Sequence, residues 1–262
     1  MREEVLIRIH GGPELPTLIY LPGLHGDWLL VTRFREAVAG QVRFVEFTYP
    51  NTTTWTLNDF ADAVAEKLRQ HNVANGWLLA ESFGSQVAWP LLTRAAGFRT
   101  DGLILAGGFG RHPWPRAVRC AEWFCARAPL ASLTTIINAY AIFARVRFKQ
   151  APTVMANVRE FKTRWGEELR QAAVHRLGLI ARNDPGELAR QATLPVYHLT
   201  GVLDPIVPWW PAQRWLRREC PGWRAHRIVW TADHNVLSTG TRAARAQVLA
   251  WLAQPSNRPH LV

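Results

Sequence analysis

The sequence predicts an α/β protein with a mostly parallel central sheet and helices on both of its faces. Short, continuously apolar runs alternate with amphipathic segments in the first half of the chain, and such runs are typical of strands buried on both faces. A helix-rich stretch interrupts this alternation, which resumes near residue 195. The length of 262 residues suffices for one large hydrophobic core.

Four apolar runs are expected to form strands in the first half: Thr17–Leu21, residues 42–47, Gly76–Ala80 and Gly102–Ala106. A polar loop after the second run leads to a helix that either Thr56 or Asn58 caps. The apolar face of this helix is made by Phe60, Ala61, Val64 and Leu68. Another helix is expected to follow the third strand, over residues 86–92.

From about residue 110 to 190 the pattern is helical and is interrupted by prolines. We expect helices at Ala117–Ala128, at Leu133–Val146 and from Val154 to about Ala181. Strand patterns return at residues 195–200 and 224–230, and a last helix runs from about 241 to 253. The expected organisation is therefore an α/β core of residues 1–109 and 191–262, with a helical insertion of residues 110–190.

The formal net charge of +11 raises the question of nucleic-acid binding. Arginine provides 28 of the 31 basic residues, and these are spread singly rather than in runs, which argues against a nucleic-acid partner. Residues 111–190 carry 14 basic and 6 acidic residues. These charges are interpreted as solvated helix faces, with attraction of an acidic substrate or partner as the alternative.

Neither a membrane span nor a secretion signal is expected. No window contains the ~18 to 20 apolar residues that a spanning helix needs, and the amino terminus begins with acidic residues. The three cysteines, Cys120, Cys125 and Cys220, lack the spacing of metal ligands. We therefore expect reduced thiols, a cytoplasmic location and no metal site.

Residues 80–84, Ala-Glu-Ser-Phe-Gly, stand between an expected strand and an expected helix. A serine flanked by small residues two positions away on each side, at such a junction, is typical of a nucleophile elbow. This strained turn holds the hydroxyl clear of the sheet, and its small residues let strand and helix nearly touch. Ser82 is thus a candidate nucleophile, although the motif is weak without further support.

A serine nucleophile needs a base and an orienting acid, which follow it in the order acid, then histidine, in one class of hydrolases. Asp204 lies in a Gly/Pro-rich loop after an expected strand, and His234 follows the last expected strand. Alone, Asp204 would be a turn residue and His234 a surface histidine. Asp233 is interpreted as a loop or capping residue, and Glu81 as a supporting residue that points away from the serine.

An oxyanion hole requires the backbone N–H after the nucleophile, here Phe83, and one from a loop that follows an earlier strand. Residues 21–27 supply that loop, and Leu24 is the expected second donor because it follows Pro22-Gly23. His25 could be a base, but its place before the nucleophile and its glycine neighbours favour a role in loop shape or pocket lining.

Four segments carry a resemblance: Leu-Pro-Gly-Leu-His-Gly, Leu-Leu-Ala-Glu-Ser-Phe-Gly, Thr-Gly-Val-Leu-Asp-Pro-Ile-Val-Pro and Asp-His-Asn. Together they resemble α/β-hydrolase-fold serine hydrolases with a helical cap, over residues 5 to 253. The resemblance implies a Ser82–His234–Asp204 triad, a cap formed by residues 110–190, and no cofactor. The chain departs from the family pattern at Ala80, at Pro22 and at Ser85, where the family more often has glycine, histidine and glycine.

The resemblance implies hydrolysis of a carboxylic ester or thioester through an acyl-enzyme, and a carboxylesterase is the favoured member. The expected substrate is a small ester with an apolar acyl group, and the candidate pocket residues are His25, Phe109, Trp209 and Val236. An acidic acyl carrier is a further candidate partner because the insertion is basic. The alternatives are a C–C bond hydrolase or lyase with the same three residues, and a non-catalytic binding protein.

Overall fold

The computed structural model describes residues 4–94, 97–147 and 165–254. Within these residues the chain forms a seven-stranded sheet in the order β1-β3-β2-β4-β5-β6-β7. Only β1 runs antiparallel to its neighbour, so the expected mostly parallel sheet is confirmed. The strands are β1 (Leu6–His10), β2 (Thr17–Leu21), β3 (Arg43–Thr48), β4 (Asn75–Glu81), β5 (Arg99–Ala106), β6 (Val196–Gly201) and β7 (Trp223–Val229).

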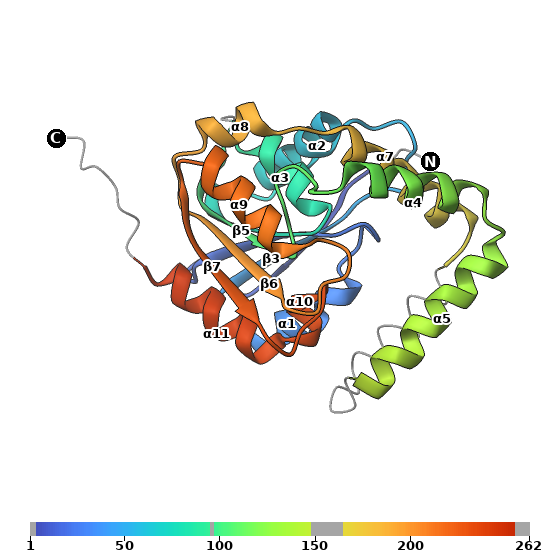
Figure 1. The fold of residues 1–262 in the computed structure, drawn as a ribbon. Helices are drawn as coiled ribbons and strands as arrows, with labels where there is room; N and C mark the ends of the chain where they lie inside the picture. The colour runs from blue at the N-terminus through green and yellow to red at the C-terminus, as the bar shows by residue number, and fades with distance from the viewer. Residues whose placement is uncertain (1–3, 95–96, 148–164, 255–262) are drawn as a thin grey trace.

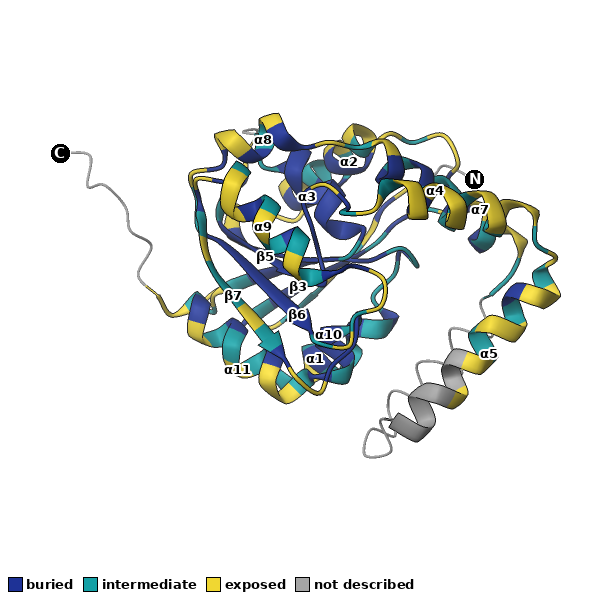
Figure 2. Cartoon of the chain, in the orientation of Figure 1, coloured by how far each residue is buried: buried dark blue, intermediate teal, exposed yellow. Residues whose placement is uncertain are grey.

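Helices cover both faces of the sheet, as Figure 1 shows. One face carries α1 (Thr32–Ala37), which follows the short 3-10 turn η1 (Leu29–Val31), and α10 (Val236–Thr239) and α11 (Thr241–Leu252). The other face carries α2 (Leu57–Gln70), α3 (Gly84–Leu91), α8 (Gly186–Gln191) and α9 (Trp209–Glu219). Two hydrophobic clusters result, one on each face, and Figure 2 shows the central strands buried between them.

The start of α2 decides between the two expected caps. Thr56 is the N-cap, since its hydroxyl accepts from the Asp59 N–H at 3.2 Å while the Asp59 carboxylate accepts from the Thr56 N–H at 2.7 Å. This reciprocal pair is a capping box, which satisfies two N–H groups that the helix leaves free. The expected apolar face, including Phe60 and Leu68, is fully buried.

Residues 110–190, the expected insertion, contain α4 (Pro115–Arg127), α5 (Leu130–Arg147), α7 (Glu167–Arg182) and most of α8, which packs against the core. The first two agree with the expected helices. α4 and α7 lie side by side, joined by Arg170, which donates to the Cys125 and Ala126 carbonyls. α5 extends away from the sheet (Figure 1). The third expected helix begins outside the described residues, at Val154, and its later part corresponds to α7.

Sequence analysis names no helix over the residues of α9, which begins with Trp209-Trp210-Pro211. Pro211 lies in the first helical turn, where its missing N–H costs no hydrogen bond, so the helix tolerates it. Among the described helices, none combines the length and the apolar character that crossing a bilayer demands.

Candidate active site

Ser82 occupies a sharp turn between β4 and α3. Its φ of +48° lies in the left-handed region, which residues other than glycine seldom adopt. The Ser82 N–H donates to the Ala106 carbonyl at 3.2 Å, which ties the turn to the end of β5. The expected strand–serine–helix turn and its strained backbone are therefore present.

Gly84 shows why the turn needs a small residue. A Cβ atom built on Gly84 would stand 2.2 Å from the Leu21 carbonyl oxygen and 2.9 Å from that of Pro22. Both atoms belong to backbone, which cannot move aside as a flexible side chain can. The start of α3 thus approaches the end of β2 at a distance that only glycine permits.

We expect Gly84→Ala to lower the free energy of unfolding by about 2 kcal/mol or more, since overpacking against fixed backbone is costly. Urea unfolding of both proteins measures the difference. Gly166→Ala is the matched control, because a Cβ at Gly166 would meet nothing within 4 Å. Equal stability of Gly84→Ala and wild type would contradict the close approach.

Ser82, His234 and Asp204 form one line of hydrogen bonds. His234 Nε2 lies 2.9 Å from Ser82 Oγ, and His234 Nδ1 lies 2.8 Å from Asp204 Oδ2. Ser82 follows β4, Asp204 follows β6 and His234 follows β7. These strands belong to the parallel run β4-β5-β6-β7, so their carboxyl ends lie at one edge of the sheet. The Leu203 N–H donates to the Ala232 carbonyl at 3.1 Å and joins the loops that carry Asp204 and His234.

The Asp204 carboxylate is held on both oxygens. Oδ1 accepts from the N–H groups of Ile206 and Val207, each at 2.9 Å, and leaves Oδ2 for His234. Burial of His234 disfavours its charged form, but the hydrogen bond and the charge of Asp204 outweigh burial and raise the pKa of His234 above its ordinary value. The site therefore favours an imidazolium, which is the species that a histidine base becomes after taking a proton.

Two further acids stand beside His234 and add smaller contributions to raising its pKa. Glu81 is buried and accepts a hydrogen bond from the Tyr20 hydroxyl. Asp233 Oδ1 accepts from the Asn235 N–H and from the Thr239 hydroxyl, each at 2.9 Å, as expected of a loop or capping residue. The His234 Nδ1–H donates to Asp204, and His234 Nε2 accepts from the Ser82 hydroxyl.

The loop after β2 lies against the nucleophile. A Cβ built on Gly23 would be 3.4 Å from Ser82 Cβ, and the Gly26 N–H donates to the Gly23 carbonyl at 2.9 Å. This bond closes a turn with Leu24 and His25 at its centre. Among the described residues, no backbone carbonyl is a hydrogen-bond partner of the N–H of Leu24 or of Phe83. Their role as oxyanion donors stays a prediction.

No protein-family model and no curated protein matches the sequence. Solved structures do match. An enol-lactonase from Burkholderia xenovorans LB400 has a TM-score of 0.77 at 17% identity, covering 95% of this chain and 96% of its own. An α/β hydrolase enzyme from a Medee basin deep-sea metagenome library has 0.79 at 12% identity, covering 100% and 98%. A thermophilic esterase from Thermogutta terrifontis has 0.73 at 20% identity, covering 95% and 92%.

The chain has the α/β-hydrolase fold. At identities of 12–20% this likeness supports the fold and leaves the reaction to be inferred from the residues of the site. The resemblance stated from the four sequence segments is thereby confirmed at the level of the fold.

The α/β-hydrolase fold places the four candidate pocket residues in different surroundings. His25 Nε2 donates to the Asp27 carbonyl at 2.9 Å, which fits the expected role in loop shape. The Trp209 ring lies against His226, with centroids 5.5 Å apart. Phe109 and Val236 are fully buried in the hydrophobic clusters. Their contact with substrate stays a prediction.

His112 is a site neighbour that sequence analysis misses. It comes from the start of the insertion, is buried, and stacks edge-on against Phe109 at 5.0 Å. Its Nδ1 accepts from the Trp114 N–H, and it forms a backbone hydrogen bond with Ile206 in the loop that holds Asp204. Burial lowers the pKa of His112, and the nearby His234 contributes. A single histidine in a loop has no sequence pattern that could reveal its position beside the loop of Asp204.

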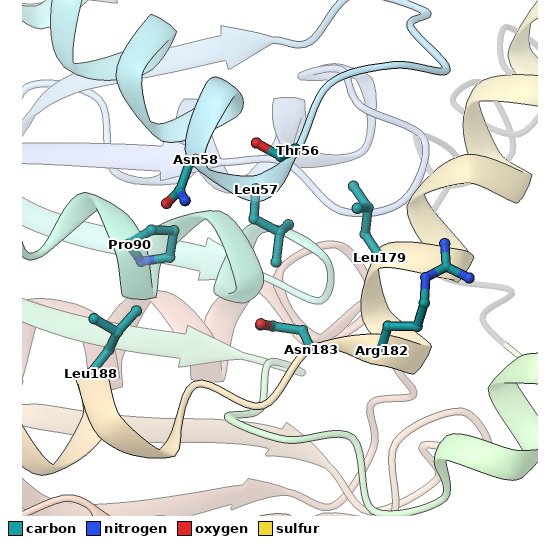
Figure 3. A pocket seen from close by; sticks show the side chains of 8 residues that line it. All are labelled: Thr56, Leu57, Asn58, Pro90, Leu179, Arg182, Asn183 and Leu188. Atoms are coloured by element: carbon teal, nitrogen blue, oxygen red, sulfur yellow. The ribbon is translucent and has the colours of Figure 1, made fainter.

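A groove lies between α2, α3, α7 and α8, and Figure 3 shows its lining. Its volume is about 310 Å³, and the residues that line it are Thr56, Leu57, Asn58, Pro90, Leu179, Arg182, Asn183 and Leu188. Asn183 donates to Gln86 Oε1 at 2.8 Å, and Gln86 donates in turn to the Phe109 and Gly110 carbonyls. None of the candidate site residues lines this groove.

Proposed function

We propose that this protein is a serine hydrolase that cleaves carboxylic esters or thioesters through an acyl-enzyme. The observation that carries the proposal is the line of hydrogen bonds from Ser82 through His234 to Asp204, with distances of 2.9 and 2.8 Å, at a strained turn. A hydroxyl, an imidazole and a carboxylate in this order constitute an activated nucleophile.

In the proposed reaction, Ser82 Oγ attacks the substrate carbonyl carbon while His234 Nε2 takes the hydroxyl proton. Asp204 stabilises the imidazolium, and the N–H groups of Leu24 and Phe83 stabilise the oxyanion, each such donor contributing ~3 kcal/mol in the transition state. His234 then donates the proton to the departing alcohol or thiol. Water repeats these steps on the acyl-enzyme, releases the carboxylic acid and restores Ser82.

The substrate class follows from the insertion and from the structural neighbours. Residues 110–190 are proposed to act as a helical cap, and this segment exposes the aromatic side chains of Trp114, Trp123 and Phe124. Such side chains favour an ester with an apolar acyl group. The neighbours include an esterase and an enol-lactonase, whose lactone bond is a cyclic ester. A carboxylesterase is therefore the proposed activity.

An activity-based label tests this proposal. A fluorophosphonate is expected to modify Ser82, and nitrophenyl esters of two to twelve carbons are expected to be hydrolysed with a preference for one chain length. Acyl thioesters, free and attached to an acidic carrier protein, form a second series. The absence of both labelling and turnover, for every ester and thioester tested, would contradict the proposal. It would favour a C–C bond hydrolase, a lyase or a binding protein.

The proposed base predicts a pH dependence. Because Asp204 and its hydrogen bond raise the pKa of His234, the imidazole is protonated over more of the neutral range than usual. Hydrolysis requires the neutral imidazole, so kcat/KM is expected to increase with pH, with a midpoint above the ordinary value of about 6.5. A pH–rate profile that is flat from pH 5 to 8 would contradict His234 as the base.

A further inference from the structure

Arg176 is a fully buried cation in the insertion helix α7. Its Nη1 donates to the Leu24 carbonyl at 2.8 Å, and its Nη2 donates to the Pro50 carbonyl at 2.9 Å. Leu24 belongs to the loop after β2, and Pro50 to the loop after β3. One guanidinium thus joins the insertion to two loops of the core.

The surroundings of Arg176 make this an unusual place for a charge. Burial lowers its pKa to about 10, so the guanidinium stays charged at neutral pH, and its Nε atom is buried without a hydrogen-bond partner. The hydrogen bonds from Nη1 and Nη2 go to carbonyl oxygens, which offset desolvation less than a carboxylate does. It also lies over the rings of Tyr49 and Phe83, with 5.9 Å to each centroid.

The loop after β2 is shaped around this guanidinium. A Cβ built on Gly26 would stand 2.3 Å from Arg176 Nη1, and Gly26 has a φ of +79°, which favours glycine. The Gly26 carbonyl accepts from the Tyr49 N–H at 2.7 Å, so the loop after β3 is fastened here as well. Arg176 fills the space between these loops, with the elbow residue Phe83 on its other side.

The Leu24 carbonyl is the group that connects Arg176 with the proposed chemistry. It belongs to the peptide that follows Leu24, and the Leu24 N–H belongs to the peptide that precedes it. Fixing the carbonyl restricts ψ of Leu24 and therefore the direction of its N–H relative to Ser82. An oxyanion donor needs such a fixed direction, because its stabilising effect depends on preorganisation.

We propose that Arg176 is a positioning residue that orients the Leu24 N–H of the oxyanion hole by holding the Leu24 carbonyl. This inference rests on the proposed hydrolase function. Since Arg176 belongs to the insertion, the oxyanion hole is complete only when α7 is seated on the core.

The test compares Arg176→Met and Arg176→Lys with wild type. Methionine fills part of the space but donates to neither carbonyl, and lysine keeps the charge but lacks the fork that bridges two carbonyls. We expect Arg176→Met to lower kcat for a nitrophenyl ester by roughly 10- to 100-fold, below the ~10²- to 10³-fold loss of an entire oxyanion donor. KM should change less than about threefold, because the interaction develops in the transition state.

A second measurement separates positioning from general damage. An alkyl trifluoromethyl ketone forms an adduct with Ser82 that carries an oxyanion, so its affinity should decrease in parallel with kcat. His175→Ala is the matched control, because His175 also lies on α7 and its Nε2 donates to a backbone carbonyl, that of Trp55 at 2.8 Å. It should keep wild-type kcat and ketone affinity. Thermal melting establishes that each variant is folded.

The outcomes distinguish the two proposals. Suppose that wild type hydrolyses the ester, that Ser82→Ala abolishes this hydrolysis, and that folded Arg176→Met keeps its kcat and ketone affinity. This result would overturn the positioning role of Arg176 and leave the proposed function standing. If Arg176→Met does not fold, kcat and ketone affinity are compared between Arg176→Lys and wild type, and unchanged values in folded Arg176→Lys would overturn the positioning role. An equal loss in His175→Ala would assign the effect to docking of α7 and overturn the inference. If the wild-type protein hydrolyses no ester and is not labelled at Ser82, the proposed function and this inference are overturned together.

Discussion

Ser82→Ala is expected to lower kcat for ester hydrolysis by about 10⁶-fold, the order of loss found when a hydrolase loses its serine nucleophile. The substitution removes the oxygen that lies 2.9 Å from His234 Nε2, and among the described residues no other hydroxyl is a hydrogen-bond partner of that nitrogen. Hydrolysis rates measured over days and loss of fluorophosphonate labelling report the effect. Turnover equal to wild type in Ser82→Ala would end the proposed mechanism.

The fold is expected to survive this substitution. Alanine differs from serine only by the hydroxyl, so the backbone at φ +48° and the packing around it stay as they are. Ser85→Ala is the matched control: Ser85 Oγ donates to the Ser82 carbonyl at 2.6 Å and accepts from the Phe109 N–H at 3.2 Å. That variant should lose about 2 kcal/mol of stability, since each of the two hydrogen bonds typically contributes about 1 kcal/mol, and it should still be labelled at Ser82.

Asp204→Asn is expected to lower kcat by about 10⁴-fold, the loss seen when a triad carboxylate becomes an amide. The asparagine oxygen can keep the two N–H donors of Ile206 and Val207, and its NH₂ group then faces His234 Nδ1. An N–H donor at this position favours the tautomer with hydrogen on Nε2. That tautomer cannot take the Ser82 proton, so the loss arises with little change in structure.

The same variant has a signature in the pH profile. Asp204 raises the pKa of His234, so its neutralisation lowers that pKa and should move the acid limb of any residual activity to lower pH. Asp233→Asn is the matched control, because the Asp233 carboxylate accepts from the Asn235 N–H and the Thr239 hydroxyl, whereas Asp204 accepts from the His234 ring. It should retain kcat within about tenfold. Equal losses in the two variants would contradict the assignment of Asp204 as the orienting acid.

Local sequence patterns were enough for most strands and for the candidate nucleophile. Apolar runs such as Thr17–Leu21 predict buried strands because every side chain in them needs an apolar neighbour. The residues around Ser82 predict a sharp turn because only small side chains fit where a strand and a helix nearly touch. The order of Ser82, Asp204 and His234 along the chain then made a single site plausible before any distance was known.

The distances themselves depended on long-range packing. Ser82 and His234 are 152 residues apart in sequence, and they meet because β4 and β7 end at the same edge of one sheet. Arg176 was counted among the solvated basic residues of the insertion, and the structure buries it beside the Leu24 loop. An arginine in an amphipathic helix has the same local pattern in water or in the core, since its surroundings are made by loops more than a hundred residues away in the chain. Tertiary packing alone therefore revealed the cation that joins the insertion to the proposed oxyanion hole.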